Sequence, residues 1–289
     1  MSIQSSELIL NPDGSIYHLN LKPEHVADTV ITVGDPNRVE KITRHFDEVE
    51  FSIKKREFHT QTGTYKGKRI TVISSGIGPD NIDIVLNELD ALVNIDFEKR
   101  EIKKELRSLD IIRIGTTGSI QESNALDSFI LSELAIGFDG VMHFYDSESV
   151  QLPDFAEAFE KHLDWFPKKA SPYVVSCDAD LADILDSDQV DRGFTATNIG
   201  FYGPQGRVLR LALQDKNMNS KLASFSHQDK KITNLEMETS TIYAMSKMLG
   251  HRAVSMNAVV ANRATMEFSA DPGKTVANLI EYCLEKLVE

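Results

Sequence analysis

The sequence predicts one α/β domain built on a mixed sheet. Two observations indicate this fold class. Short runs of β-branched and aliphatic residues, typical of buried strands, alternate with segments whose apolar residues recur at helical spacing. No internal repeat, low-complexity tract or linker interrupts the alternation, so we expect a single domain over residues 1–289.

The strands are predicted where such apolar runs end at glycine or at polar residues. The run at 30–33 ends at Gly34, and the run at 68–75 ends at Gly76. Glycine at the end of a strand lets the backbone turn or approach a ligand closely. The predicted strands are residues 30–33, 68–75, 109–112, 129–131, 173–175 and 253–261.

The helices are predicted from prolines, glycines and apolar spacing. Proline suits the first turn of a helix because its missing N–H would have no partner there. Glycine, as at Gly250, is the usual residue just after a helix. The predicted helices are residues 36–46, 153–163 and 239–249, with two more that begin at Pro79 and Pro272. Residues 98–107 carry many charges of both signs and predict an exposed helix or excursion.

The composition is that of a soluble globular protein with an acidic surface. Hydrophobic residues make up 41% and charged residues 26%, and the formal net charge is -13. That charge disfavours nucleic acid and anionic membranes as partners. It also makes clustered arginines more informative, because the general field repels an anionic ligand.

Targeting and redox signals point to a cytoplasmic protein. No apolar run approaches membrane-spanning length, and the N-terminal residues lack a basic stretch before an apolar core. The two cysteines, Cys177 and Cys283, have no metal-type spacing and are expected to be ordinary reduced thiols.

One motif carries the strongest chemical signal. Arg113-Ile114-Gly115-Thr116-Thr117-Gly118 follows the apolar run 109–112, so an arginine, two hydroxyls and two glycines arrive together at the predicted strand end. The guanidinium fork fits an oxyanion, and an arginine among isoleucines needs a buried partner. A second anion-type loop, Gly34-Asp35-Pro36-Asn37-Arg38, lies upstream. Together they predict a site for a phosphate-sized anion.

These motifs give the chain its resemblance to a known family. Gly34–Val39, Lys55–Phe58, Arg113–Gly118, Phe201–Arg207 and Glu236–Glu238 follow the order found in the nucleoside phosphorylases, and most resemble the uridine-cleaving members. The resemblance covers nearly the whole chain. It implies a partly barrel-like sheet flanked by helices, and phosphate-dependent cleavage of a pyrimidine nucleoside, uridine, to free base and ribose 1-phosphate. It implies no required cofactor, with inorganic phosphate as co-substrate.

The resemblance also assigns the phosphate and ribose residues. Phosphate would be held by Gly34, Arg38, Arg113 and Thr116, with Arg56 from a partner subunit. Ribose would be bound by Met237 and Glu238, with His18 reaching across a dimer. Without the other motifs, Glu236 and Glu238 fit equally well as acids favoured by the dipole of a helix N-terminus.

The base would be bound by a glycine-rich loop and by small apolar residues. Gln205 offers a donor and an acceptor to the edge of uracil, and Arg207 would stabilise charge on the departing base. By resemblance, Arg113, Gln205, Arg207 and Glu238 are the catalytic set. The remaining base-binding residues are Thr117, Gly118, Phe201, Val260 and Ala261. Arg263 fits either a water in the base pocket or a neighbouring carboxylate.

Several alternatives stay open at the level of sequence. Purine-cleaving relatives carry an aspartate after the late apolar strand, where this chain has Asn262-Arg263, so pyrimidines are favoured. A purine nucleoside phosphorylase, a hydrolytic nucleosidase and a non-catalytic nucleoside-binding protein remain the alternatives. A dinucleotide-binding fold is disfavoured because no Gly-x-Gly-x-x-Gly follows the first strand.

The resemblance implies a homo-oligomer built from dimers, up to a hexamer, with active sites at the dimer interface. It also implies a potassium site formed by Glu57, Ile77 and Asn81, although asparagine stands where the family usually has serine.

Overall fold

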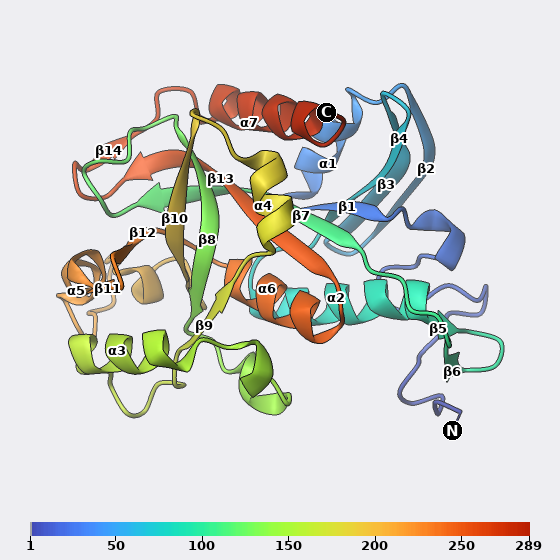
Figure 1. The fold of residues 1–289 in the computed structure, drawn as a ribbon, viewed down its shortest axis with the longest axis horizontal. Helices are drawn as coiled ribbons and strands as arrows, with labels where there is room; N and C mark the ends of the chain where they lie inside the picture. The colour runs from blue at the N-terminus through green and yellow to red at the C-terminus, as the bar shows by residue number, and fades with distance from the viewer. Residues whose placement is uncertain (1) are drawn as a thin grey trace.

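The structure, a computed structural model, describes residues 2–289; Met1, the first residue of the expected domain, lies outside them. It confirms the α/β fold class, with helices packed around one large mixed sheet (Figure 1). The helices are α1 (Pro36–Thr43), α2 (Pro79–Asn94), α3 (Pro153–Leu163), α4 (Ala179–Leu185), α5 (Met218–Ser224), α6 (Thr239–Met248) and α7 (Pro272–Lys286). The strands are β1 (Thr29–Val33), β2 (Glu48–Lys55), β3 (Phe58–Tyr65), β4 (Lys68–Ser74), β5 (Ile95–Asp96), β6 (Glu101–Ile102), β7 (Asp110–Ser119), β8 (Phe129–Gly137), β9 (Tyr173–Ser176), β10 (Val190–Thr197), β11 (Ser226–His227), β12 (Lys230–Glu236), β13 (Arg252–Asn262) and β14 (Glu267–Phe268).

The sheet closes on itself at one end. Its main path runs β11-β12-β10-β8-β13-β7-β1-β4-β3-β2, and β12 also pairs with β7. Strands β7, β13, β8, β10 and β12 therefore form a closed ring, while β1, β4, β3 and β2 continue as an open extension (Figure 1). Parallel pairs such as β7–β13 coexist with antiparallel pairs such as β12–β7. The expected mixed, partly barrel-like sheet is thus confirmed.

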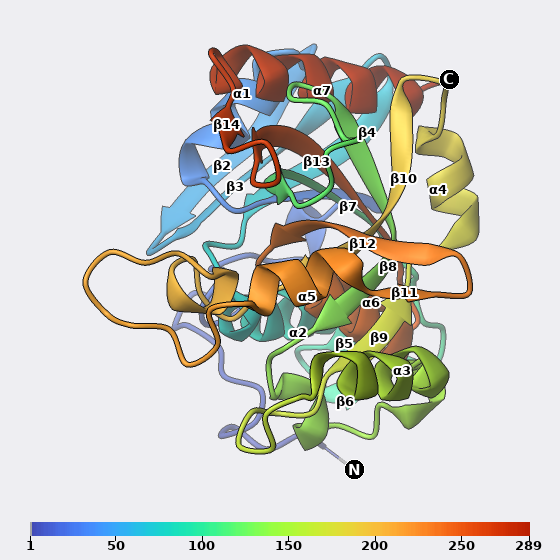
Figure 2. The same cartoon turned by 90° about the vertical axis from the view of Figure 1, so that its left-hand side faces the viewer.

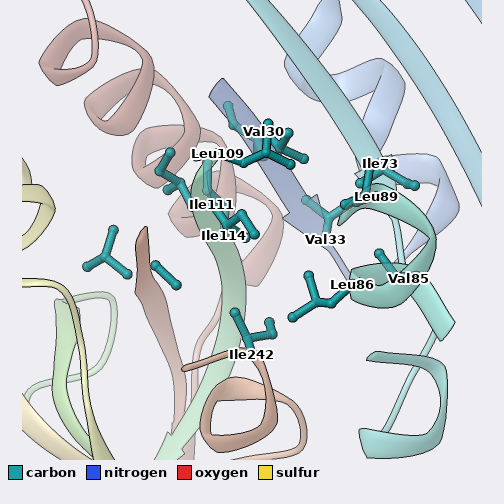
Figure 3. Close-up of a cluster of buried hydrophobic side chains, with 14 of the residues drawn as sticks. Val30, Val33, Ile73, Val85, Leu86, Leu89, Leu109, Ile111, Ile114 and Ile242 are labelled. Carbon is teal, nitrogen blue, oxygen red and sulfur yellow. The ribbon is translucent and has the colours of Figure 1, made fainter. Parts of the chain in front are cut away.

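Helices on the sheet bury the apolar core. The apolar side chains on one face of α2 are all buried, at no more than 1% exposure: Ile82, Val85, Leu86 and Leu89. Figure 3 shows Val85, Leu86 and Leu89 beside side chains of β1 and β7, among them Val33 and Ile114. Viewed from the side, α7 lies along one end of the molecule and α3 along the other (Figure 2). Within residues 2–289, no helix has both the length and the hydropathy that a membrane crossing requires.

The strand that carries Arg113 continues well past it, which corrects the sequence prediction. We expected the strand to end after Ile112, but β7 runs to Ser119. The strand that ends here is β1, whose last pair with β7 joins Thr32 and Arg113, while β13 accompanies β7 to its end. Because β1 stops here, the later part of β7 no longer has β1 beside it. This part of β7 forms one wall of a cavity.

Two other segments differ from expectation. The first helix ends at Thr43 rather than near Phe46. The charged segment 98–107 is an excursion that contains β6 in a small two-stranded pairing with β5. Arg100 in this excursion donates to the carbonyl of Ile3 at 2.8 Å, which ties the excursion to the N-terminal segment.

Candidate active site

A cavity of about 490 Å³ lies where β1 ends beside β7. It is bounded by the loop before α1, the second half of β7, the end of β12, the end of β13 and the loop after β10. Thirteen of the residues predicted for substrate binding line it: Gly34, Arg38, Arg113, Thr116, Thr117, Gly118, Phe201, Gln205, Arg207, Met237, Glu238, Val260 and Ala261. Residues that are far apart in sequence therefore converge on one space of small-molecule size.

Arg113 is the most constrained cation of this cavity. It is 5% exposed, and its terminal nitrogens are bonded on both sides. Nη2 lies 2.7 Å from Glu238 and 3.0 Å from Glu236, whereas Nη1 donates to Asn257 Oδ1 at 2.7 Å. The sequence prediction that this arginine needs a buried partner is confirmed, and the partners are two carboxylates.

Gly115 makes room for this arrangement. A Cβ at residue 115 would lie 2.1 Å from Nη1 of Arg113, closer than any non-bonded carbon and nitrogen can approach. The side chain of Arg113 therefore runs along β7 and covers the face of Gly115. One of the two motif glycines serves the arginine itself rather than a ligand.

The two glutamates at the end of β12 have different environments. Glu236 is fully used inside the protein, because it accepts from the Thr197 hydroxyl at 2.6 Å and from the backbone N–H groups of residues 238 and 239. Among residues 2–289, the Glu238 carboxylate accepts only from Arg113 and from the Gly78 N–H at 2.9 Å. A carboxylate has about four acceptor positions, so Glu238 keeps two for a ligand.

Burial dominates the electrostatics of Glu238. Removal from water raises the pKa of this carboxyl, the charge of Glu236 adds to the rise, and Arg113 opposes it. Burial also lowers the pKa of the Arg38 guanidinium, and the neighbouring charge of Arg113 lowers it further. Two arginines that repel each other at the wall of one cavity are a common arrangement for holding an anion between them.

The anion end of the cavity also includes the start of α1. Asp35 caps the helix by accepting from the Asn37 N–H at 2.9 Å, and Pro36 occupies the first turn. Arg38 donates to the Ile114 carbonyl at 3.1 Å, which holds its guanidinium against β7. Gly34 and Thr116 line the same end.

The loop after β10 contributes a compact cluster to the cavity lining. Arg207 donates to the carboxamide oxygen of Gln205 and to the Phe201 carbonyl, each at 2.6 Å, and its Cζ lies 3.8 Å from the Phe201 ring centroid. Gln205 is 3% exposed. Arg263 donates to the Gln205 carbonyl rather than to a neighbouring carboxylate. The aromatic ring, amide and guanidinium are thereby held as one unit.

His18 and Arg56 do not line this cavity. Both are close to Tyr17: the ring centroids of His18 and Tyr17 are 4.7 Å apart, and Arg56 Cζ lies 5.9 Å from the Tyr17 ring. His18 Nδ1 bonds to Glu88 at 2.7 Å. The two residues assigned by resemblance to the partner subunit therefore both lie near Tyr17, and neither lines the cavity of its own chain.

The three residues assigned to a cation also gather together. A Cβ on Gly76 would lie 2.5 Å from Asn81 Nδ2 and 3.0 Å from Glu57 Cγ, so both side chains approach the same backbone position. Ile77 follows directly and lines the substrate cavity as well. Among the residues that the structure describes, no cluster of three histidine, cysteine or acidic side chains is placed to hold a metal.

Some cavity residues were not singled out from sequence. Glu236 was recognised only as an acid near a helix start, and Asp35, Leu235 and Phe268 were not identified as cavity residues at all. Phe268 belongs to the two-residue strand β14, which is too short for a periodicity signal. The polar Ser255 and Asn257 inside an otherwise apolar strand were the available signal for the contacts of Arg113.

Comparison with known proteins agrees with the fold. A family model described as the phosphorylase superfamily matches residues 28–289. The chain therefore belongs to the phosphorylase superfamily. A solved nucleoside phosphorylase from Trypanosoma brucei, reported to have uridine phosphorylase activity, has a TM-score of 0.87 and 31% identity over 98% of this chain and 99% of that one.

Relatives of known sequence include both pyrimidine and purine enzymes. The uridine phosphorylase of Thermococcus kodakarensis is 30% identical over 99% of this chain and 91% of its own length. A DeoD-type purine nucleoside phosphorylase of Oceanobacillus iheyensis is 25% identical over 94% of this chain and 99% of its own. The family is therefore established, and the base has to be argued from the site.

Proposed function

We propose that this chain is a uridine phosphorylase, which cleaves uridine with inorganic phosphate to uracil and ribose 1-phosphate. The observation that carries the proposal is the content of one 490 Å³ cavity, which is lined by Arg38 and Arg113, by Glu238, and by Gln205 and Arg207. These three sets of side chains suit the three parts of the reaction, which are anion, sugar and base.

Phosphate is assigned to the end formed by the Gly34 backbone, Arg38, Arg113 and Thr116. A tetrahedral dianion needs several donors in fixed directions, which guanidinium groups supply. Arg38 is held by the Ile114 carbonyl with its other donors uncommitted among the described contacts. Arg56 of a second subunit would complete the group.

Ribose is assigned to Glu238 and Met237. The two acceptor positions that Glu238 keeps free suit two neighbouring hydroxyls of a sugar, and Met237 lines the cavity beside it. His18 of the second subunit would meet the 5′-hydroxyl, in agreement with its place outside its own cavity.

The base is assigned to Gln205, Arg207 and Phe201, with Thr117, Gly118, Val260 and Ala261 around them. Asn262, where purine enzymes carry an aspartate, has no capacity to protonate a leaving base. Its amide nitrogen donates to the carbonyls of Gln121 and Asn124, and its oxygen accepts from the backbone at 264 and 265. This argues for a pyrimidine, whose departing charge Arg207 can stabilise.

The reaction then needs no covalent enzyme intermediate. A phosphate oxygen forms a bond to C1′ as the bond from C1′ to N1 of uracil breaks, and the electron pair of that bond leaves with the base. Positive charge builds on the ribose ring, as in glycoside hydrolysis. Holding both reactants together can lower the barrier by about 7 kcal/mol or more. Fixed donors at Arg207 stabilise the uracil anion.

The assembly is part of the proposal. We propose homodimers, grouped up to a hexamer, in which Arg56 and His18 complete the neighbouring site. Glu57, the Ile77 carbonyl and Asn81 gather around Gly76 and would hold a potassium ion, which would supply charge to the subunit contact.

A phosphorolysis assay tests the proposal. Purified protein is incubated with uridine, thymidine or inosine, with and without phosphate, and free base is measured. We expect uracil release only with phosphate. Preference for inosine would favour the purine alternative, base release without phosphate would favour a nucleosidase, and binding without turnover would leave a non-catalytic protein.

A further inference from the structure

A continuous chain of buried hydrogen bonds visits every strand of the closed ring. It begins at Arg113 on β7, whose Nη1 donates to Asn257 Oδ1 on β13 at 2.7 Å. Asn257 Nδ2 donates to Ser132 Oγ on β8 at 3.0 Å. The Ser132 hydroxyl lies 2.5 Å from the Thr195 hydroxyl on β10.

The chain then returns to β7. Thr195 Oγ1 donates to Asn234 Oδ1 on β12 at 3.0 Å, and Asn234 Nδ2 donates to Thr117 Oγ1 on β7 at 2.8 Å. Thr117 finally donates to the Leu235 carbonyl at 2.8 Å. None of these side chains is more than 5% exposed. The path follows the ring of strands in Figure 1, with one link for each neighbouring pair.

All the links point in the same direction. A hydroxyl has one hydrogen, and that of Thr195 goes to Asn234 Oδ1, which cannot donate. Ser132 must therefore donate to Thr195 and accept from the Asn257 amide nitrogen. The amide oxygen of Asn257 must then point toward Arg113. Hydrogen bonds that run in one direction polarise one another, and here the run starts at a cation.

Both ends of the chain lie in the substrate cavity, but its middle does not. Arg113 and Thr117 line the cavity, whereas Asn257, Ser132, Thr195 and Asn234 do not. The Thr117 hydrogen is used by Leu235, so its hydroxyl can offer a ligand only an oxygen lone pair. The chain therefore fixes what each end can present to substrate.

We propose that Asn257 is a positioning residue for Arg113. By accepting from Nη1, it orients the guanidinium so that Nη2 meets Glu236 and Glu238 together. The other links hold the Asn257 amide in the one orientation that allows this. The proposal rests on the proposed function, in which Arg113 serves phosphate and Glu238 serves ribose.

Two substitutions at one position and a matched control test this role. Asn257→Leu removes the acceptor, and Asn257→Asp keeps it. The control is Asn94→Leu: Asn94 is also buried and also bonded, to Asp90 Oδ1 at 2.6 Å and to the Arg107 carbonyl at 3.1 Å, but it does not line the cavity. Thermal unfolding, kcat and the KM values for uridine and phosphate are measured for all variants.

We expect Asn257→Leu to lower kcat/KM for both substrates by about 10- to 100-fold per folded molecule, the range for losing a hydrogen bond to a charged group. Asn94→Leu should lower Tm without changing kcat or either KM. Equal kinetics in the two leucine variants would overturn the proposal, because Asn257 would then only support the core.

The pH dependence of the Asn257→Asp variant provides a further test, because a purely structural role of Asn257 would not alter it. An uncharged aspartic acid can accept from Arg113 and donate to Ser132, as asparagine does. An ionised one would be a third carboxylate around Arg113, beside Glu236 and Glu238, with the Tyr243 hydroxyl from α6 bonded nearby to the Ser132 carbonyl. The activity of this variant relative to wild type should therefore rise as pH falls, while that of Asn257→Leu stays flat. If the ratio of variant to wild-type activity does not change with pH for either variant, the proposal is contradicted.

The wild-type enzyme separates this proposal from the proposed function. Should wild type not cleave uridine with phosphate, the proposed function fails, and a crystal structure of Asn257→Leu decides the positioning role. A guanidinium displaced from Glu238 supports it. An Arg113 that keeps its parental contacts overturns it.

Discussion

Gly115→Ala is the sharpest single perturbation of the site. The added Cβ would lie 2.1 Å from Nη1 and 2.5 Å from Cζ of Arg113. Gly115 has no positive φ, so alanine fits the backbone and the conflict is only steric. The guanidinium must leave its place, or β7 must shift away from its neighbours.

The expected magnitude follows from what Arg113 touches. Overpacking a close-packed region costs about 1–3 kcal/mol. If the guanidinium leaves, Glu236 and Glu238 become buried carboxylates without a cation, and losing one partner of a buried ion pair costs about 3–5 kcal/mol. We therefore expect a loss of roughly 3 kcal/mol in the free energy of unfolding. A charged hydrogen bond worth about 1.5–3 kcal/mol predicts a fall in kcat/KM of about 10- to 100-fold.

Urea unfolding and steady-state phosphorolysis measure the two effects. The control is Gly140→Ala, because a Cβ there meets nothing closer than Ala170 Cβ at 3.7 Å and Gly140 lies outside the substrate cavity. Wild-type stability and kinetics in Gly115→Ala would refute the argument that Arg113 has no other place to go.

Three further predictions concern pH, the partner subunit and the thiols. Because burial raises the pKa of Glu238 above its ordinary 4.5 and the carboxylate is the acceptor, kcat/KM for nucleoside should fall on the acid side at a higher pH than for a normal glutamate. The Glu238→Gln variant should not show this fall in kcat/KM at acid pH. If the fall is unchanged in the variant, another group causes it. Arg56→Ala and Glu238→Gln, refolded together, should be more active than either variant alone if sites are shared; no gain would mean that each chain works by itself. Burial raises the pKa of Cys177 to about 11 and that of Cys283 further, so a thiol reagent near neutral pH should label both only after denaturation, and fast labelling of the native protein would contradict their burial.

Local patterns in the sequence were enough to predict the class of fold. Helix starts at Pro36, Pro79, Pro153 and Pro272 were correct because proline acts within one turn. The end of β7 was wrong because strand length depends on neighbours: β13 accompanies β7 to Ser119, and no pattern within 109–119 records that.

The candidate site likewise contains residues that local sequence patterns could assign and residues that they could not. Motif residues such as Arg38, Thr116 and Gln205 could be assigned from short stretches and do line one cavity. The partners of Arg113 could not, because Glu236, Glu238 and Asn257 reach it from strands that are more than a hundred residues away in sequence. The pairing of β13 with β7 brings Asn257 to Arg113, and the closing of β12 onto β7 brings the two glutamates.

The charge of the cavity gives the strongest reason to expect a second chain in the working site. Three arginines and three carboxylates line it: Arg38, Arg113, Arg207, Asp35, Glu236 and Glu238. Their formal charges cancel, so one chain offers no net attraction to a phosphate dianion inside a protein of net charge -13. Arg113 contributes little excess, because its terminal nitrogens are already bonded. In the proposed dimer a cation from the second chain would restore the balance, and Arg56, which is exposed beside Tyr17 and does not line its own cavity, would supply it.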